Sequence, residues 1–168
     1  MGDGFTIPAE LLETFNGEAL ETKIAVSAML CTVDAEGWPH TAFLSVGELL
    51  LGSQSRIQMI LWPAATTVRN LERARRGTIL AVADGAVGEL RFGLNDMFAG
   101  DGVGTLIDGR VTAVRKHGAP YAEVAGLIGF RLHDEPGTII RWRNQIALLR
   151  KWNPAPLSRG SREGGAGT

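Results

Sequence analysis

The sequence predicts a mainly β protein: an antiparallel, closed or partly closed barrel of about six strands, with a helix between strands 3 and 4 and a short N-terminal helix. Three observations predict it. Runs of apolar and β-favouring residues recur from Lys23 to Val114, separated by short turns. One segment among them, after Pro63, changes to helical spacing. Strands and helices do not alternate regularly, which favours a barrel over a βαβ sheet.

Size and composition indicate one globular unit. The chain has 168 residues, of which 45% are hydrophobic and 21% charged, so it is long enough to bury a core. The formal net charge of −1 gives no overall field toward nucleic acid or an anionic membrane, and neither partner is expected. We expect a single domain over residues 1–157 and a flexible C-terminal tail over 158–168, which has little to bury.

Cysteine and histidine usage exclude some site chemistries. The single cysteine, Cys31, lies in an apolar run where a buried, inert thiol is expected. His40, His117 and His133 share no ligand spacing, so no metal site is expected. With no visible signal peptide and no apolar stretch near the ~20 residues that span a bilayer, a cytoplasmic location is expected.

The first half of the chain contains the clearest element signals. Leu11, Leu12 and Phe15 follow Pro8 at helical spacing and predict the N-terminal helix. Strands are predicted over residues 23–33, over 38–51 as one continuous strand, and over 57–63, where a proline ends the third.

The next segment is the predicted helix. Val68, Leu71 and Ala74 mark its apolar face, and Gly77 ends it. Strands follow over residues 78–84, 89–98 and 105–114, and the Gly-rich loop AGDGVG between the last two is predicted to be a connection.

The segment TIIRWRNQIALLRKW fits two elements. Ile139, Trp142, Ile146 and Leu149 have helical spacing, but the Ile and Trp content also suits a strand, so both remain open.

The start of the predicted helix carries the main chemical signal. A strand turns sharply into a helix that begins with Thr66 and Thr67, where unpaired amides and the helix dipole can hold a phosphate together with Arg69. The ordinary alternative is that Thr66 is a helix N-cap and Arg69 a solvated residue, and spacing alone favours it.

The AEGWPHTAFL hairpin, and the later strand followed by TTVRNL, resemble the pyridoxamine 5′-phosphate oxidase-like FMN-binding split-barrel superfamily. The similarity covers about Ile7 to Lys116. It implies a split β-barrel that forms a homodimer, with FMN held near the subunit interface. Asn70 is expected to pin the loop before the helix. The cofactor-binding residues that the resemblance implies are Phe43, Leu44, Ser45, Ile60, Leu61, Trp62, Thr66, Thr67, Arg69 and Asn70.

The chain departs from the oxidases at three cationic positions. An arginine and a lysine of the second strand correspond to Ala42 and Gly47, and a lysine at the helix start corresponds to Thr67. Arg69, Arg56 or an arginine of a partner subunit would have to replace them. These departures argue against a vitamin B6 oxidase.

The function that the resemblance implies is an FMN-dependent oxidoreductase or flavin reductase, with a nicotinamide dinucleotide as the electron donor. No catalytic side chain is assigned, because the flavin itself carries the electrons. Two alternatives remain: a deazaflavin-dependent reductase, and a non-catalytic flavin- or haem-binding protein.

Overall fold

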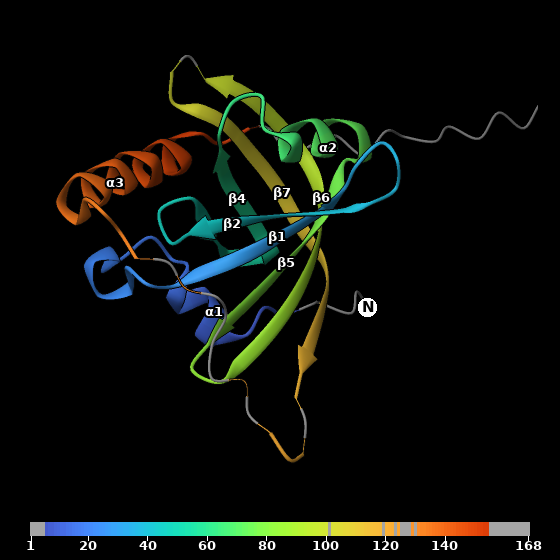
Figure 1. Ribbon diagram of the computed structural model, residues 1–168, viewed down its shortest axis with the longest axis vertical. Helices are drawn as coiled ribbons and strands as arrows, with labels where there is room; N and C mark the ends of the chain where they lie inside the picture. The colour runs from blue at the N-terminus through green and yellow to red at the C-terminus, as the bar shows by residue number, and fades with distance from the viewer. Residues whose placement is uncertain are drawn as a thin grey trace, which may run out of the picture.

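The structure is a computed structural model that describes residues 6–100, 102–118, 120–122, 124, 129 and 131–154. The predicted tail at 158–168 lies outside these residues. A curled antiparallel sheet forms the body, with helices packed around it (Figure 1). The class predicted from the sequence is therefore confirmed, with seven strands in place of about six. The strands are β1 (Ser27–Val33), β2 (Pro39–Ser45), β3 (Leu49–Leu51), β4 (Arg56–Leu61), β5 (Arg76–Ala83), β6 (Ala86–Gly100) and β7 (Gly104–His117).

The additional strand arises because the predicted second strand is broken. The sheet order is β2-β1-β5-β6-β7-β4-β3, so the two halves of that strand lie at opposite ends of the sheet. The turn between them is held by the Glu48 carboxylate, which accepts hydrogen bonds from the Ser45 amide at 2.9 Å and hydroxyl at 2.8 Å. The Ile60 amide then donates to the Glu48 carbonyl at 3.0 Å. This turn links the two end strands of the sheet, which curls into a half-barrel.

The barrel interior is filled by alternate residues of the strands. Leu30, Ile79, Leu90 and Ile107 are fully buried, and each comes from a different neighbouring strand. Their burial follows from the two-residue period of a strand, which sends alternate side chains to one face. A single hydrophobic core therefore runs through the barrel.

Short N-terminal helices cover one part of the core. Helix α1 (Ala9–Thr14) buries Leu11 and is followed by the fully buried Phe15, as its spacing predicted. The Leu51 amide donates to the Phe15 carbonyl at 2.8 Å, which ties this segment to β3. Two 3-10 turns, η1 (Leu20–Lys23) and η2 (Ser53–Ser55), complete the connections.

Helix α2 (Thr66–Ala74) follows β4, which is the strand that the sequence predicts as the third. Its predicted apolar face is buried at Val68 and Leu71. The helix ends at Arg75, which adopts left-handed dihedrals with φ 55°. Helix α2 packs against β1, β2 and β5.

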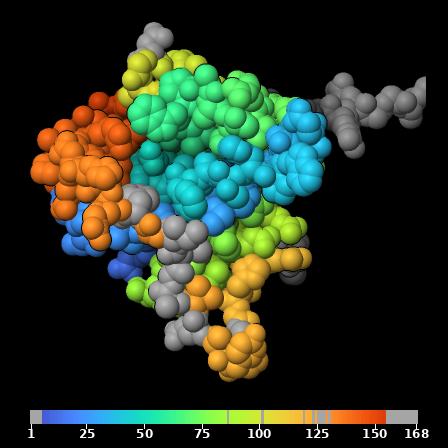
Figure 2. Space-filling model, in the orientation of Figure 1, coloured from blue at the N-terminus to red at the C-terminus, as the bar shows by residue number. Residues whose placement is uncertain are grey.

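The C-terminal segment that the sequence left open is helix α3 (Glu135–Lys151). Its four helically spaced residues, Ile139, Trp142, Ile146 and Leu149, are all buried. The Asp134 side chain accepts a hydrogen bond from the Gly137 amide at 3.1 Å and caps the start of the helix. The N-terminal segment lies next to α3 on one side of the molecule (Figure 2).

Helix α3 packs on the turn that closes the barrel. The indole of Trp142 is 1% exposed and lies directly over Gly47. A Cβ atom placed on Gly47 would lie 2.0 Å from Trp142 Cγ, so a side chain at position 47 would displace the indole. Gly47 is therefore required for this contact.

The other end of α3 is held by buried polar contacts. Gln58 of β4 donates its side-chain amide to the Leu149 carbonyl at 2.9 Å and the Trp152 carbonyl at 3.0 Å. These bonds satisfy carbonyls that the helix end leaves unpaired. Within the described ranges, no helix combines the length and the apolar character needed to cross a bilayer.

Candidate functional site

The predicted phosphate site begins where β4 turns into α2. Ala64 has a positive φ of 58°, and Ala65, not Thr66, is the N-cap residue of the helix. The Val68 and Arg69 amides donate to the Ala65 carbonyl at 3.0 and 3.3 Å. The amides of Thr66 and Thr67 come before the first amide that donates within the helix. Amides at this position of a helix are the ones that can bind an anion.

Arg69 braces this turn. Its guanidinium donates to the Ala64 carbonyl at 2.6 Å and to the Thr66 hydroxyl at 3.0 Å. Arg69 is exposed, but these two bonds hold its side chain at the helix start. Because a guanidinium has five N–H donors, others are left to bind an anion.

Asn70 and Thr67 lie deeper, on the buried side of α2. Asn70 is 2% exposed, and its amide donates to the Thr32 hydroxyl of β1 at 3.0 Å. This bond attaches the helix to the barrel. Thr67 is 3% exposed.

The predicted ring contacts divide into buried and exposed side chains. Leu44, Ser45, Ile60 and Leu61 are buried, whereas Phe43 is 49% and Trp62 69% exposed. Exposed aromatic side chains at the end of β4 and on β2 are the groups that a planar ligand can reach.

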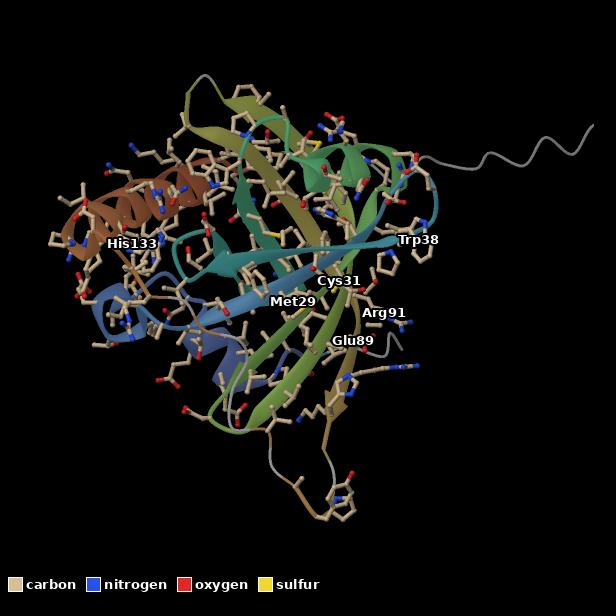
Figure 3. All side chains as sticks on the ribbon, in the orientation of Figure 1. Met29, Cys31, Trp38, Glu89, Arg91 and His133 are labelled. Carbon is tan, nitrogen blue, oxygen red and sulfur yellow. The ribbon has the colours of Figure 1, made fainter. Side chains whose placement is uncertain are left out.

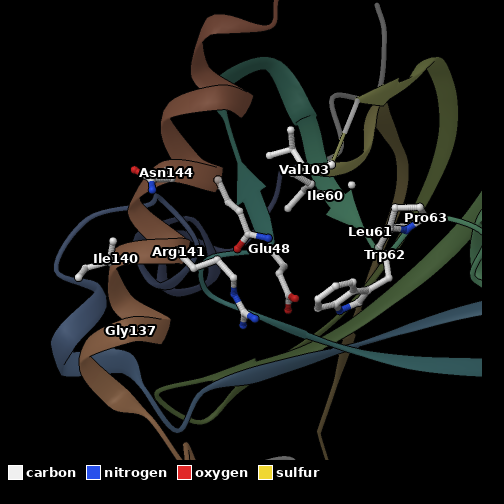
Figure 4. Close-up of a pocket in the computed structure, with 13 residues that line it drawn as sticks. Glu48, Ile60, Leu61, Trp62, Pro63, Val103, Gly137, Ile140, Arg141 and Asn144 are labelled. Atoms are coloured by element: carbon white, nitrogen blue, oxygen red, sulfur yellow. The ribbon is translucent and has the colours of Figure 1, made fainter.

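A cavity of about 430 Å³ lies between the end of β4 and helix α3 (Figure 4). This volume is within the range of small-molecule sites. The structure brings Ile60, Leu61 and Trp62 into its wall, but the predicted residues of β2 and α2 do not line it. Its described lining residues are Glu48, Ile60, Leu61, Trp62, Pro63, Gly102, Val103, Gly104, Gly137, Ile140, Arg141, Asn144 and Gln145.

Three side chains give this cavity its polar character. Glu48 from the barrel-closing turn, Arg141 from α3 and Trp62 from the end of β4 point toward the same space (Figure 4). The Arg141 guanidinium lies 6.0 Å from the centroid of the Trp62 ring, at the outer limit of a cation–π contact. An aromatic surface, a cation and a carboxylate thus face one cavity.

Gln145 also lines the cavity. Its Oε1 atom is buried away from solvent and has no hydrogen-bond partner among the described residues. A buried, unpaired amide oxygen is costly, so a movement that brings it a donor would be favoured.

The α3 residues of the cavity were missed at the level of sequence. The signal was present, because helical spacing of Ile139, Trp142 and Ile146 places Arg141 and Gln145 beside the buried face. The AGDGVG loop was predicted as a connection, and its residues Gly102 to Gly104 also line the cavity.

The structure explains one of the three cationic positions and one of the expected replacements. Trp142 fills the space at Gly47. Arg56, an expected replacement, donates to Asp108 at 2.6 Å and to the Trp152 carbonyl at 3.3 Å, so its side chain is engaged within the protein. Among the described residues, Arg69 lies at the helix start and Arg141 lies at the cavity, where an anion could reach each guanidinium group.

Cys31 lies on the outer face of β1, and its side chain is half-buried, so the prediction of a buried thiol was wrong in degree. Burial raises the pKa of its thiol, and the Glu89 carboxylate raises it further. Glu89 itself is held by hydrogen bonds from Arg91 and His117, which lower its pKa despite the opposing effect of desolvation. A raised pKa disfavours the thiolate, which is the reactive form of a cysteine.

Comparison with known proteins gives likenesses at the level of fold. No protein-family model matches the chain. The uncharacterized protein YclD of Bacillus subtilis (strain 168) is 26% identical over 144 residues, covering 84% of this chain and 94% of that protein. HupZ of Group A Streptococcus has a TM-score of 0.52 and 16% identity over 66% of this chain and 94% of that one. An FMN-binding protein from Syntrophomonas wolfei subsp. wolfei has a TM-score of 0.49 and 16% identity, covering 66% and 88% of the two chains.

The barrel, its closing turn and the helix after β4 define the class of this protein. It has the curled antiparallel half-barrel that the sequence predicts, and its fold is similar to that of HupZ.

Proposed function

We propose that this chain is a flavin-binding oxidoreductase or flavin reductase that takes FMN. The observation that carries the proposal is the pairing of two features at the end of β4. Trp62 lies exposed in the wall of a ligand-sized cavity, and three residues later the chain enters a helix start with available amides. FMN has a planar ring and a phosphate, which are the two groups that these features suit.

The cavity residues fit the ring portion. Trp62 offers an aromatic face, and the polar residues Asn144 and Gln145 line the same cavity. Arg141 supplies positive charge at the same wall, which favours an electron-rich ring.

The helix start fits the phosphate portion. The Thr66 and Thr67 amides, the Thr66 hydroxyl and the Arg69 guanidinium would hold it. This set contains one charged donor where the oxidases have three cations, so the phosphate contributes less to affinity than in those enzymes. The same shortage is the reason to test a deazaflavin beside FMN.

A bound flavin supplies the two-electron chemistry, and the protein binds it, orients it and limits the access of water. The proposed electron donor is a nicotinamide dinucleotide.

A visible spectrum tests the proposal directly. Purified protein, before and after addition of FMN or a deazaflavin, should show the absorption of the bound ring. Bleaching by a reduced nicotinamide dinucleotide under anaerobic conditions would then distinguish an enzyme from a binder. A protein that takes up neither compound would refute the flavin proposal.

Replacement of Thr66 by alanine tests the phosphate contact separately. A hydrogen bond to a charged group contributes about 1.5–3 kcal/mol, so FMN affinity should fall about tenfold or more. Riboflavin, which has no phosphate, should bind the variant as well as it binds the original protein. Fluorescence titration measures both constants, and an equal loss for the two ligands would contradict the phosphate assignment.

We also propose a homodimer. On the outer face of the sheet, Met29 of β1 pairs with Phe43 of β2 and Leu80 of β5, which forms a row of apolar side chains that are half-buried or exposed. Such a row favours association with a second copy. Light scattering should give twice the chain mass, and Phe43→Glu should shift the protein toward the monomer. A monomeric original protein at micromolar concentration would refute this.

A further inference from the structure

A second and larger cavity lies at the opposite end of helix α2 from Thr66. Its volume is about 910 Å³, and it lies where the end of α2 meets the start of β5. We call it the arginine cleft. Its described lining residues are Cys31, Thr32, Val33, Asp34, Pro39, Arg73, Ala74, Arg75, Arg76, Gly77, Thr78, Arg91, Phe92, Gly93 and Thr112.

The outer face of the sheet forms the floor of the arginine cleft. Cys31 of β1 pairs with Thr78 of β5, which pairs with Arg91 of β6, so the three side chains form one row. Figure 3 shows Cys31 and Arg91 on the same side of the molecule. A Cβ atom placed on Gly93 would have Thr112 Cγ2 as its nearest neighbour, at 4.0 Å. The space above Gly93 is therefore open to the cleft.

Four arginines surround this floor: Arg73, Arg75, Arg76 and Arg91. Arg73 donates to the Val33 carbonyl, and Arg75 donates to the Asn95 carbonyl at 3.1 Å. Carbonyl partners orient a guanidinium but leave its charge intact.

Two carboxylates lie near these arginines. Asp34 lines the cleft, and its Oδ1 atom accepts hydrogen bonds from the Glu36 and Trp38 amides at 3.0 and 2.8 Å. Glu89 pairs with Arg91 at 3.0 Å. The cleft therefore keeps an excess of positive charge, in a chain whose formal net charge is −1.

Basic residues at the end of a helix ordinarily interact with the helix dipole, and Arg73 in the last turn and Arg75 at the C-cap have that position. Arg91 comes from β6, and Arg76 begins β5, so neither serves that purpose. Convergence of arginines from separate elements on one cavity is the arrangement that binds phosphate groups.

The wall of the arginine cleft also has an apolar part. Val33 is 48% exposed, and Pro39 and Ala74 lie in the same wall. An inorganic anion would leave this surface uncovered, whereas the body of an organic phosphate can cover it.

We propose that the arginine cleft binds an organic phosphate of nucleotide size, with its phosphate groups on Arg76 and Arg91 and its organic body against Val33 and Pro39. This site is distinct from the proposed flavin phosphate site. The nine residues of α2 separate the two by about 13 Å at the helical rise.

Calorimetric titration with ADP at low salt tests this proposal. ADP should bind, and Arg76→Gln and Arg91→Gln should each weaken it about tenfold or more, the loss expected for one charge-assisted contact. The matched control is Arg131→Gln, which removes the same charge from an exposed residue outside the cleft lining. Equal weakening by the control, or no ADP binding by about 1 mM, would overturn the proposal.

Two further ligands separate the components of the site. Adenosine should bind at least tenfold more weakly than ADP, and so should inorganic pyrophosphate. Pyrophosphate binding as tight as that of ADP would overturn the organic part. Arg76 and Arg91 are both exposed, so their replacement should not unfold the protein. Circular dichroism should show that both variants are folded.

A titration of flavin-loaded protein distinguishes this proposal from the proposed function. ADP should bind without releasing flavin, because the two sites lie at opposite ends of α2. Release of flavin in proportion to bound ADP would mean that one site takes both ligands and would overturn the second site. If the protein takes up no flavin, the ADP titration and its arginine variants still decide the proposal.

Discussion

Trp142→Ala should lower the free energy of unfolding by about 3–5 kcal/mol, which is the range for removing a large aromatic side chain from a core. Trp142 is 1% exposed and holds α3 against the turn that joins the two ends of the sheet. Its loss therefore leaves a void at the point where the barrel closes. Urea or thermal unfolding, followed by circular dichroism, measures the change.

The matched control for this variant is Ile140→Ala on the same helix. Ile140 is 59% exposed, so its removal should change stability by less than about 1 kcal/mol. Similar losses for both variants would contradict the packing argument.

A double-mutant cycle with Gly47 makes the test sharper. Gly47→Ala should destabilise the protein by about 1–3 kcal/mol through overpacking, because the new Cβ meets the indole. In the Trp142→Ala background the same change should cost much less, since the indole is absent. Additive losses would mean that the two residues do not act through their contact.

Trp62→Ala should weaken flavin binding about 10- to 100-fold, because stacking of a planar heterocycle on an aromatic side chain contributes about 1–3 kcal/mol. Trp62 is 69% exposed, so the fold does not depend on its burial, and the loss should appear in binding with little change in stability. Flavin titration gives the affinity, and a melting curve gives the stability.

Trp38→Ala is the control for Trp62. It is an equally exposed tryptophan at 71%, on the hairpin between β1 and β2 and outside the cavity lining. Its removal should leave flavin affinity unchanged. If the two variants weaken flavin equally, or neither does, Trp62 is not part of the flavin site.

The site was predictable in part from the chain. The strand–turn–helix pattern at Trp62 to Asn70 identified the helix start, because proline and the change of period are local signals. The cavity beside Trp62 was not predictable, since Arg141, Asn144 and Gln145 lie about 80 residues further along the chain. The alternative prediction that Thr66 is the N-cap residue was wrong. The N-cap residue is Ala65, and the Thr66 hydroxyl accepts a hydrogen bond from Arg69.

The sequence by itself determined the class of the fold, the N-terminal helix, α2 and most strands, because alternation and helical spacing are properties of neighbouring residues. Only the tertiary structure decided where the second strand breaks and that α3 is a helix. Residues 38–51 are predicted as one strand, and the break at Val46 to Glu48 depends on the Glu48 carboxylate and on Trp142 packing over Gly47. The bond from Ser45 to Glu48 is local, but Trp142 lies 95 residues beyond Gly47, so local patterns around Gly47 contain no record of that contact.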